Sequence, residues 1–427
     1  MKIKNPFRPI SISLSPNTEK DDILLAAKTI FQPDKWKVGN AILKLESIFR
    51  DYLKVKYATS FNSGRSAMLA ILKSLELKPG DEVLLQAFTC NAAVNPVIWA
   101  GLKPVYVDCD AETFNMDVHD LMKKITPQSR VVVVQHTFGL PADVEWISEI
   151  CQEKNLIMIE DCAHALGADY GLPRASLEGK KVGTLGKAAF FSFSRDKIIS
   201  SVYGGMAVTN DPLIARKVRD FQQESGYPGP WWIFQQLLHP LLMNWIILPT
   251  YRIFGKFLLI LLQWTRVLSK AVHYQEKRGQ KPSYFPYALP NALAILALNQ
   301  FSKLNRFNNY RRKLAYFYLH SLRDCLVNLP PDPQSVKQTF LRLSVKVKDS
   351  RKIIKKFRRK NILIGDWYTS PVAPPDTKLE KLGYAYGSCP VAERLAKETI
   401  NLPTHINISE ADAQKIVKLF KLFVAKK

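Results

Sequence analysis

Three short segments of the sequence carry side chains that together suit one kind of chemistry. Residues 62–66 read Asn-Ser-Gly-Arg-Ser before an apolar stretch, residues 157–161 form an apolar run that ends in Glu-Asp, and Lys197 follows the Phe- and Ser-rich residues 190–194. A helix start with small residues binds phosphate, a carboxylate stabilises a protonated ring nitrogen, and a lysine amine bonds to an aldehyde. Pyridoxal phosphate needs these three groups from a protein, so the segments predict a site for that cofactor.

Each segment has a simpler interpretation when it is taken alone. Lys197 is then a solvated lysine after a strand, and Asp161 is a turn or helix-cap residue at a strand end. The Ser-Gly-x-Ser pattern at residues 63–66 is a weak signal by itself. The cofactor prediction therefore depends on the three segments occurring together and in this order.

Longer blocks of the sequence resemble the DegT/DnrJ/EryC1/StrS family of sugar aminotransferases, which are fold-type I pyridoxal-phosphate enzymes. The blocks occur in the family's order, and the resemblance spans residues 35–225 and 285–425. The matching residues are 38–39 with 45–46 and 57–58, 61–68, 79–83, 135–143, 159–165, 191–193 with Lys197, 392–394 and 402–405. Their combination is specific to the family, although each block is short.

The resemblance implies an α/β fold with a mostly parallel central sheet covered by helices and a smaller C-terminal α+β domain. It also implies a pyridoxal-phosphate-dependent aminotransferase that converts a keto sugar, expected to be nucleotide-linked, into an amino sugar for polysaccharide biosynthesis. Glutamate is the expected amino donor, and a homodimer is the expected assembly. The alternatives are another pyridoxal-phosphate reaction, such as elimination or dehydration, and a membrane-associated regulator that kept the fold without activity.

By the same resemblance, Lys197 and Asp161 are the expected catalytic residues. The expected cofactor-binding residues are Gly64, Arg65, Ser66, Cys90, Asp161, His164, Ser192 and Lys197. His164 lies where the family places Gln or His beside the cofactor ring, and a buried structural histidine is an equal alternative. His136 and His405 also lie in matching blocks, and we expect structural roles for both.

The sequence departs from the family pattern near the expected site. Cys90 follows Thr89 where the family has an aromatic residue that stacks on the ring, so either Cys90 packs against the ring or another aromatic residue such as Phe88 does. Arg65 replaces a threonine, and its guanidinium binds either the cofactor phosphate or an acidic sugar nucleotide. The family's asparagine that reaches the partner subunit aligns near Pro286. These departures leave the identity of the substrate open.

Composition and charge limit the class of protein. The chain has 427 residues, of which 47% are hydrophobic and 23% charged, as in a globular protein with sizeable cores. Its formal net charge of +24 attracts nucleotide sugars or anionic lipid, and no helix-turn-helix or zinc pattern indicates nucleic acid. The six cysteines lack metal-ligand spacing and residues 1–6 lack an apolar signal region, so we predict no metal site and a reduced, cytoplasmic environment.

Apolar runs alternate with helical patterns over residues 53–225, as in a parallel sheet covered by helices. The expected strands are 82–86, 103–107, 130–135, 156–160, 188–194 and 205–209, with a half-exposed strand at 340–347. Residues 351–360 are strongly basic, and we interpret them as a solvated amphipathic helix. The predicted parts are an N-terminal arm (1–34), a large cofactor-binding domain (35–226), an apolar helical insertion (227–282) and a helix leading into the small C-terminal domain (283–427).

The segment between Lys197 and Pro286 spans 286 − 197 = 89 positions, which is longer than the family pattern. Residues 231–270 hold blocks of Trp, Leu, Ile and Phe that are broken by Pro240 and Pro249 and flanked by Arg and Lys. No run of about 18 apolar residues occurs, so a spanning helix is not expected. We expect peripheral contact with an anionic membrane at its cytoplasmic face, and the alternative is a helical hairpin buried in a dimer interface or over the core.

Overall fold

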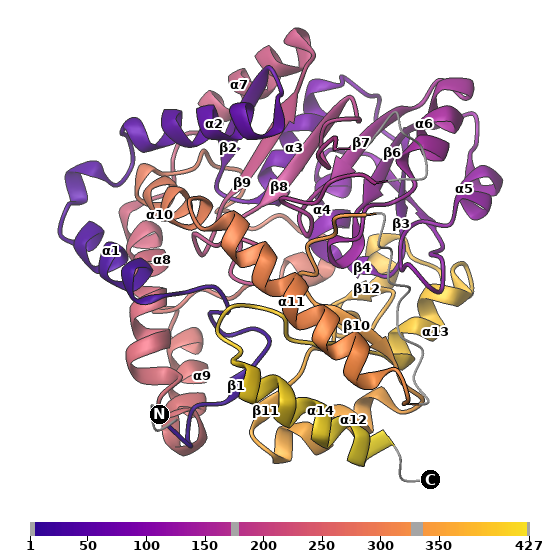
Figure 1. Cartoon of the computed structure of the whole chain (residues 1–427). Helices are drawn as coiled ribbons and strands as arrows, with labels where there is room; N and C mark the ends of the chain where they lie inside the picture. Colours follow the sequence, from indigo (N-terminus) through magenta and orange to yellow (C-terminus); the bar gives the residue numbers. More distant parts are fainter. Residues whose placement is uncertain (1–4, 172–178, 326–335, 425–427) are drawn as a thin grey trace.

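The computed structural model describes residues 5–171, 179–325 and 336–424, and it contains a central sheet of seven strands in the order β2-β9-β8-β7-β6-β3-β5 (Figure 1). β9 is antiparallel to both of its neighbours, and the other neighbouring pairs are parallel. The strands are β2 (Tyr57–Phe61), β3 (Glu82–Gln86), β5 (Lys103–Val107), β6 (Ser129–Gln135), β7 (Ile157–Asp161), β8 (Ala188–Ser192) and β9 (Gly205–Thr209). This confirms the predicted α/β fold, and each of the six strands predicted for this sheet begins within one residue of its predicted position.

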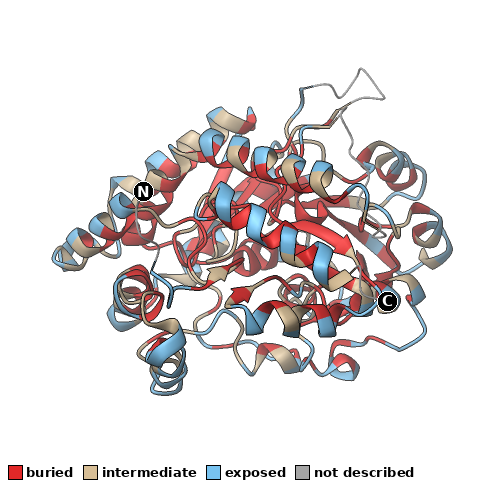
Figure 2. Cartoon of the chain, turned by 60° about the horizontal axis from the view of Figure 1, so that its bottom comes forward, coloured by how far each residue is buried: buried red, intermediate tan, exposed pale blue. Residues whose placement is uncertain are grey.

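The central strands are buried on both faces because their side chains alternate between two hydrophobic cores. In β6, Val132 and Val134 belong to one core, whereas Val131 and Val133 belong to the other. Successive side chains of a strand point to opposite faces, so an uninterrupted run of valines fills both cores. Figure 2 shows this buried sheet in red, with the exposed residues on the outer sides of the helices.

Helices cover both faces of the sheet. Those that close the first core are α2 (Asn40–Leu53), α5 (Val118–Lys124), α6 (Val144–Glu153) and α10 (Asn291–Phe301). Those that close the second core are α3 (Gly64–Ser74), α4 (Asn91–Trp99), α7 (Pro212–Ser225) and α13 (Pro390–Glu398). Short 3-10 helices occur at Pro33–Lys35, Thr137–Gly139, Glu276–Arg278 and Leu379–Leu382.

A third hydrophobic core builds the smaller C-terminal part. The elements around it are α11 (Leu304–Leu322), α12 (Ser350–Arg359), α14 (Glu410–Val424) and the antiparallel pair β10 (Leu343–Lys346) and β13 (Thr399–Leu402). The prediction of a half-exposed strand at 340–347 is wrong, because this packing buries every residue of that range except Lys346, which is partly exposed.

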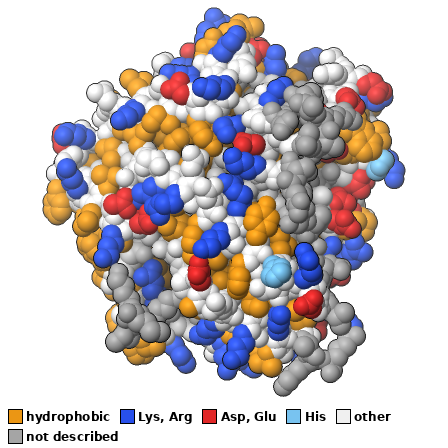
Figure 3. Space-filling model, viewed as in Figure 1, with side chains coloured by type: hydrophobic (Ala, Val, Ile, Leu, Met, Phe, Trp, Pro, Cys, Tyr) orange, Lys and Arg blue, Asp and Glu red, His pale blue; other side chains and the backbone are white. Residues whose placement is uncertain are grey.

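The basic run forms α12, as predicted. Ile353 and Phe357 are buried against the C-terminal core, and most of the basic side chains of the helix are exposed. Lys and Arg side chains are spread over the whole face that Figure 3 shows, in keeping with the net charge of +24.

Two short strand pairs join distant parts of the chain. β1 (Ile10–Ser11) is parallel to β11 (Ile362–Leu363), so the N-terminal arm is attached to the C-terminal part. β12 (Val372–Ala373) is parallel to β4 (Thr89–Cys90), which brings the chain that precedes β12 to the carboxyl edge of the central sheet.

A bent pair of helices at residues 230–264, which we call the hairpin, follows α7. It comprises α8 (Pro230–Leu242), π-helical turns at Met243–Ile247 and Tyr251–Gly255, and α9 (Lys256–Trp264). Figure 1 shows α8 beside α1 (Lys20–Ile30), and α9 away from the central sheet. Among the described residues no single helix is long and apolar enough to cross a membrane, and the two arms that reach this length together are bent by 109°.

Candidate active site

A pocket opens where β6, β7 and β8 end, next to the first turns of α3 and α4. Open α/β sheets bind ligands at this edge. Seven of the eight predicted cofactor-binding residues line the pocket: Gly64, Arg65, Cys90, Asp161, His164, Ser192 and Lys197. Ser66 does not line it, because its hydroxyl donates to Asn62 and its backbone N–H donates to Ser63 within the start of α3.

Lys197 lies in the loop after β8, and its side chain is part of the pocket wall. Its amino group makes no hydrogen bond to another described residue and lies 5.2 Å from the centre of the Trp367 ring. Burial, together with the nearby Arg342 guanidinium, outweighs the attraction of Asp161 and lowers the pKa of Lys197 to about 8. A neutral amine is a nucleophile, so near neutral pH this lysine can react with an aldehyde.

Asp161 ends β7 and is almost fully buried beside the pocket. Its Oδ1 accepts the backbone N–H of Ala163 at 2.9 Å, and its Oδ2 accepts no hydrogen bond from the described residues. Burial raises the pKa of Asp161, and the positive charge of Lys197 opposes that rise. A cationic N–H group at Oδ2 would supply the missing partner and keep the carboxylate charged. The protonated ring nitrogen of pyridoxal phosphate is such a group.

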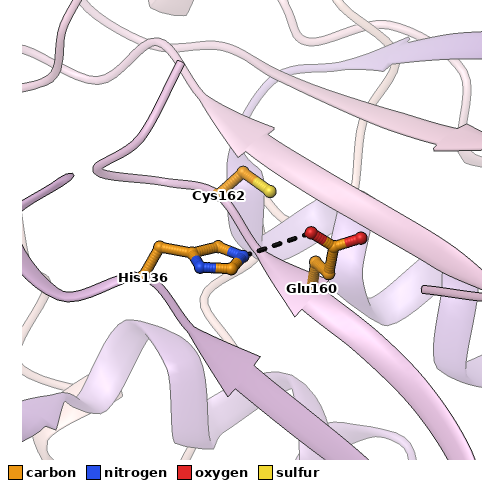
Figure 4. A group of neighbouring side chains, drawn as sticks. All are labelled: His136, Glu160 and Cys162. Carbon is orange, nitrogen blue, oxygen red and sulfur yellow. Dashed lines mark hydrogen bonds and ion pairs between the residues drawn. The ribbon is translucent and has the colours of Figure 1, made fainter. Parts of the chain in front are cut away.

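Glu160, the residue before Asp161, forms a cluster with His136 and Cys162 whose ligand atoms are close enough to hold a metal ion (Figure 4). However, both carboxylate oxygens already accept hydrogen bonds. The donors to Glu160 are the backbone N–H groups of Gly183, Leu185 and Gly186, the Tyr170 hydroxyl and His136 Nε2. Although burial opposes the charge, these hydrogen bonds hold the pKa of Glu160 below its ordinary value.

Both ring nitrogens of His136 also make hydrogen bonds. Its Nδ1 accepts the backbone N–H of Ala142 at 3.0 Å, so its proton is on Nε2, which donates to Glu160 at 3.2 Å. Burial raises the pKa of the Cys162 thiol well above its ordinary value, so the sulfur stays protonated. The cluster therefore fixes the end of β7, and with it the position of Asp161. This geometry supports the structural role expected for His136.

His405, the other histidine for which we expect a structural role, lies away from the pocket. Its Nε2 donates to the backbone carbonyl of Ser11 at 2.8 Å, and its Nδ1 accepts the backbone N–H of Asn407 at 3.3 Å. Burial lowers the pKa of His405 to about 3, so the ring is neutral. The ring ties the N-terminal arm to the C-terminal part.

The start of α3 meets the end of β8 at the pocket. A Cβ atom on Gly64 would lie 3.0 Å from Ser192 Cβ and 3.4 Å from Ser192 Oγ, so glycine allows the close approach of helix and strand. The described residues supply no acceptor for the backbone N–H groups of Gly64 and Arg65. The hydroxyls of Ser192 and Ser194 lie 3.1 Å apart, and both residues line the pocket. Free N–H groups at a helix start, together with two hydroxyls, form an anion site that suits phosphate.

Arg65 does not offer a free guanidinium to this anion site. It forms an ion pair with the fully buried Glu276, approaches the Ala271 carbonyl at 3.4 Å and lies 4.5 Å from the centre of the Phe285 ring. Burial disfavours its charge, but the Glu276 carboxylate raises the pKa of Arg65. Arg65 therefore holds the chain that follows the hairpin against the pocket, where Ala271 and Val272 form part of the wall.

His164 is neutral and stacks with an aromatic pair that we did not predict. Burial and the charge of Lys197 hold the pKa of His164 well below its ordinary value. Its ring centre is 5.6 Å from that of Trp367 with an angle of 19° between the planes, and Tyr368 lines the same pocket. Trp367 and Tyr368 follow β11 in the C-terminal part, and their only sequence signal is an adjacent aromatic pair outside any periodic run.

The residue at the expected stacking position is a small one. Cys90 lines the pocket, and burial raises the pKa of its thiol, so it stays protonated. Phe88, the aromatic candidate named from the sequence, packs on Phe114, Phe138 and Tyr368 and is not part of the pocket wall. The remaining residues of the wall are Thr89, Ala92, Ala93, Gln135, Ala163, Phe190, Arg195 and Asp196.

The pocket therefore fits pyridoxal phosphate at its three reactive points. It offers the Lys197 amine with its lowered pKa, a carboxylate oxygen of Asp161 that accepts no hydrogen bond from the described residues, and N–H and hydroxyl groups near Gly64 and Ser192. These groups come from three segments that are far apart in the sequence and meet at one edge of the sheet.

Comparisons with known proteins point to one family of enzymes. A sequence model of the DegT/DnrJ/EryC1/StrS aminotransferase family matches residues 17–232 and 265–421, and the residues between them are most of the hairpin. The chain is similar to GDP-perosamine synthase of Escherichia coli O157:H7, with 27% identity over 91% of this chain and 92% of that protein. It is 26% identical to UDP-N-acetyl-3-dehydro-alpha-D-glucosamine 3-aminotransferase of Acidithiobacillus ferrooxidans over 94% of each chain. A putative sugar aminotransferase of Streptococcus pneumoniae, solved in its PMP form, matches the fold with a TM-score of 0.76, 20% identity and 98% coverage of each chain.

Proposed function

The chain belongs to the DegT/DnrJ/EryC1/StrS aminotransferase family of pyridoxal-phosphate enzymes, and we propose that it transfers an amino group to a nucleotide-linked keto sugar. Pyridoxal phosphate is the proposed cofactor and glutamate the proposed amino donor. One observation carries the proposal: Lys197, Asp161 and the anion site between Gly64 and Ser192 share one pocket.

Different residues of the pocket would hold different parts of the cofactor. Pyridoxal phosphate, when bound, supplies an aldehyde that exchanges amines and a ring that accepts electrons. The start of α3, Ser192 and Ser194 would hold its phosphate, and Asp161 would hold its ring nitrogen. The neutral His164 adds a flat, uncharged wall to the site.

Lys197 is suited to move the proton that the reaction requires at the substrate carbon. With a pKa of about 8, its Nζ both accepts and returns a proton near neutral pH. A negative charge on Asp161 would favour a protonated partner opposite it in the buried pocket. These two residues are therefore the proposed catalytic residues.

The names of two relatives support the substrate proposal. One name contains a GDP-linked amino sugar, and the other contains a UDP-linked dehydro sugar. The test combines the protein, pyridoxal phosphate, glutamate and a panel of keto-sugar nucleotides. We expect 2-oxoglutarate and an amino sugar in equal amounts with at least one substrate, and neither with Lys197→Ala. Release of neither product by the wild-type protein from the whole panel would overturn the proposal.

We also propose a homodimer, as the family resemblance implies. The structure supports it with large apolar side chains that are exposed near the N-terminal end of the described chain: Leu24, Phe31, Val38 and Leu43, between 63% and 85% exposed. Association of two copies would remove such apolar side chains from water. Light scattering should give twice the mass of the chain for the wild type, and Phe31→Ser should shift the protein towards the monomer. A monomeric wild-type protein would contradict this part of the proposal.

A further inference from the structure

Helix α9 is strongly apolar and yet has no buried residue. Seven of its nine residues are Phe, Leu, Ile or Trp, and none of the nine, all of which the structure describes, is buried. A helix of this composition is normally found inside a core or a membrane. Exposed apolar surface of this kind marks a site that another phase or partner covers.

The most exposed side chains of α9 lie on one face. Phe257, Ile260, Leu261 and Trp264 have the spacing i, i+3, i+4, i+7, and Ile253 and Phe254 extend the row by one turn. We call these six residues the apolar stripe. Phe257 is 70% exposed and Trp264 is 77% exposed.

The opposite side of α9 faces the protein. Leu258, Leu259 and Leu262 pack on a small core that contains Met243 and Ile247 of the same hairpin. The helix is therefore already seated on its inner side, and the apolar stripe faces away from the molecule. Refolding of α9 onto the core would not cover the stripe without uncovering the inner leucines.

The charged residues of the hairpin and of the chain beside it are of one sign. Residues 225–275 contain no Asp or Glu, and the exposed residues Arg252, Lys256, Arg266 and Lys270 lie within or beside the stripe in the sequence. Phe7 is 42% exposed and accepts the backbone N–H of Arg252 at 3.3 Å, which adds an apolar group at this end. Anionic lipid headgroups attract such basic residues, and apolar side chains between them enter the boundary of the acyl chains.

A second copy of this chain fits the apolar stripe poorly. A symmetric interface brings the same patch of both copies together, so the basic residues of two stripes would meet without an acidic residue from this segment. An anionic surface supplies the missing charge. The exposed Trp264 of the stripe also suits a lipid interface, where the ring is buried and the N–H stays hydrated.

We propose that the apolar stripe is a docking surface for an anionic lipid bilayer, with α9 lying in the plane of the headgroups. α8 cannot enter the bilayer with it, because Ile233 and Leu237 are fully buried in the protein core. The bend of 109° between the two arms of the hairpin agrees with a helix that lies on the surface and does not cross it.

Docking at the apolar stripe keeps the pocket close to the membrane. The chain runs from Trp264 to Ala271 in the pocket wall, and 271 − 264 = 7 residues span at most about 25 Å. On the way, Ser269 accepts a hydrogen bond from Arg195, and the Lys270 carbonyl accepts one from Tyr203. Docking would therefore hold Ala271 of the pocket wall within about 25 Å of Trp264 at the bilayer surface.

Flotation of the full chain with vesicles tests this proposal. The vesicles contain phosphatidylcholine alone or with about 30% phosphatidylglycerol, at low and at high salt. We expect the wild type to float with the anionic vesicles at low salt and to be released by high salt. Phe257→Ser with Trp264→Ser should lower the bound fraction at least tenfold, and Arg252→Gln with Lys256→Gln should lower the affinity about fivefold for each charge.

Tyr386→Ser is the matched control, because Tyr386 is 74% exposed and lies far from the hairpin in the sequence. It should bind vesicles like the wild type. Brominated lipids provide a second measurement on the wild type: they should quench tryptophan fluorescence, and Trp264→Phe should remove part of that quenching. Wild-type protein that ignores anionic vesicles, or a stripe variant that binds them equally well, would overturn the proposal. Loss of dimers in the stripe variant together with no vesicle binding would show an interface between copies. None of these readouts depends on aminotransferase activity.

Discussion

The pH dependence of Lys197 tests the chemistry of the pocket most directly. The pKa of Lys197 falls from 10.5 to about 8, chiefly because burial disfavours the charged form. At pH 7 the neutral amine then rises from roughly 0.03% to roughly 9% of the molecules, a gain of about 300-fold. Between pH 6 and pH 8 the neutral fraction grows about 50-fold, and above pH 9 it is nearly constant.

The assay mixes cofactor-free protein with pyridoxal phosphate between pH 6 and pH 10 and follows the initial rise in visible absorbance. The same measurement on Nα-acetyl-lysine, divided by the neutral fraction of its own amine, corrects for the titration of pyridoxal phosphate itself. Borohydride then fixes the adduct, and mass spectrometry of the peptides identifies the modified lysine. We expect the corrected rate to level off between pH 8 and pH 9, with the adduct on Lys197.

Two variants complete this test. Lys197→Arg should give no fixed adduct. Lys187→Arg is the matched control: Lys187 lies just before β8, its side chain is 54% exposed, and it pairs with Asp211 at 2.7 Å. This control should react like the wild type. A corrected rate that still climbs about tenfold per pH unit from 8 to 10, or an adduct on another lysine, would refute the assignment.

Three further predictions concern the rest of the site. Asp161→Asn should retain much of the cofactor but lose most turnover. It should also move the rate plateau of Lys197 to lower pH, because the Asp161 carboxylate raises the pKa of Lys197. Near-normal turnover would show that Asp161 does not have the proposed role. Ser192→Ala should weaken retention of pyridoxal phosphate by about 1–3 kcal/mol in equilibrium dialysis, whereas Ser225→Ala, outside the pocket, should not. Arg65→Met should lower the free energy of unfolding by about 3–5 kcal/mol, because it leaves the Glu276 carboxylate buried and unpaired. Adding Glu276→Met to the same chain should restore most of the lost stability. An unstable double variant would contradict this reasoning.

The sequence by itself determined the central sheet. The valine run of β6 and the apolar run of β7 are continuous because both faces of these strands are buried, and this pattern is visible without a structure. The prediction of a half-exposed strand at residues 340–347 is wrong for a related reason. Residues 340–347 alternate in polarity, but Arg342 and Ser344 are buried there beside Trp367 and Asn401, which the pattern cannot show.

The sequence also predicted residues that line the pocket, because a helix start, an acid at a strand end and a lysine after a strand are local features. It could not show that Arg65 forms an ion pair with Glu276, because the two residues are 211 positions apart in the sequence. The pair forms only when the segment after the hairpin folds back onto the pocket. The same holds for Trp367, which reaches the pocket from the C-terminal part through the pairing of β12 with β4.

The apolar insertion shows most clearly which features the sequence determines and which the tertiary structure determines. Composition placed apolar blocks and basic flanks between residues 231 and 270, and left open whether lipid or protein covers them. Only the tertiary structure separates the buried α8 from the exposed α9, because the bend between them and the packing of the inner leucines decide which apolar side chains remain in contact with water.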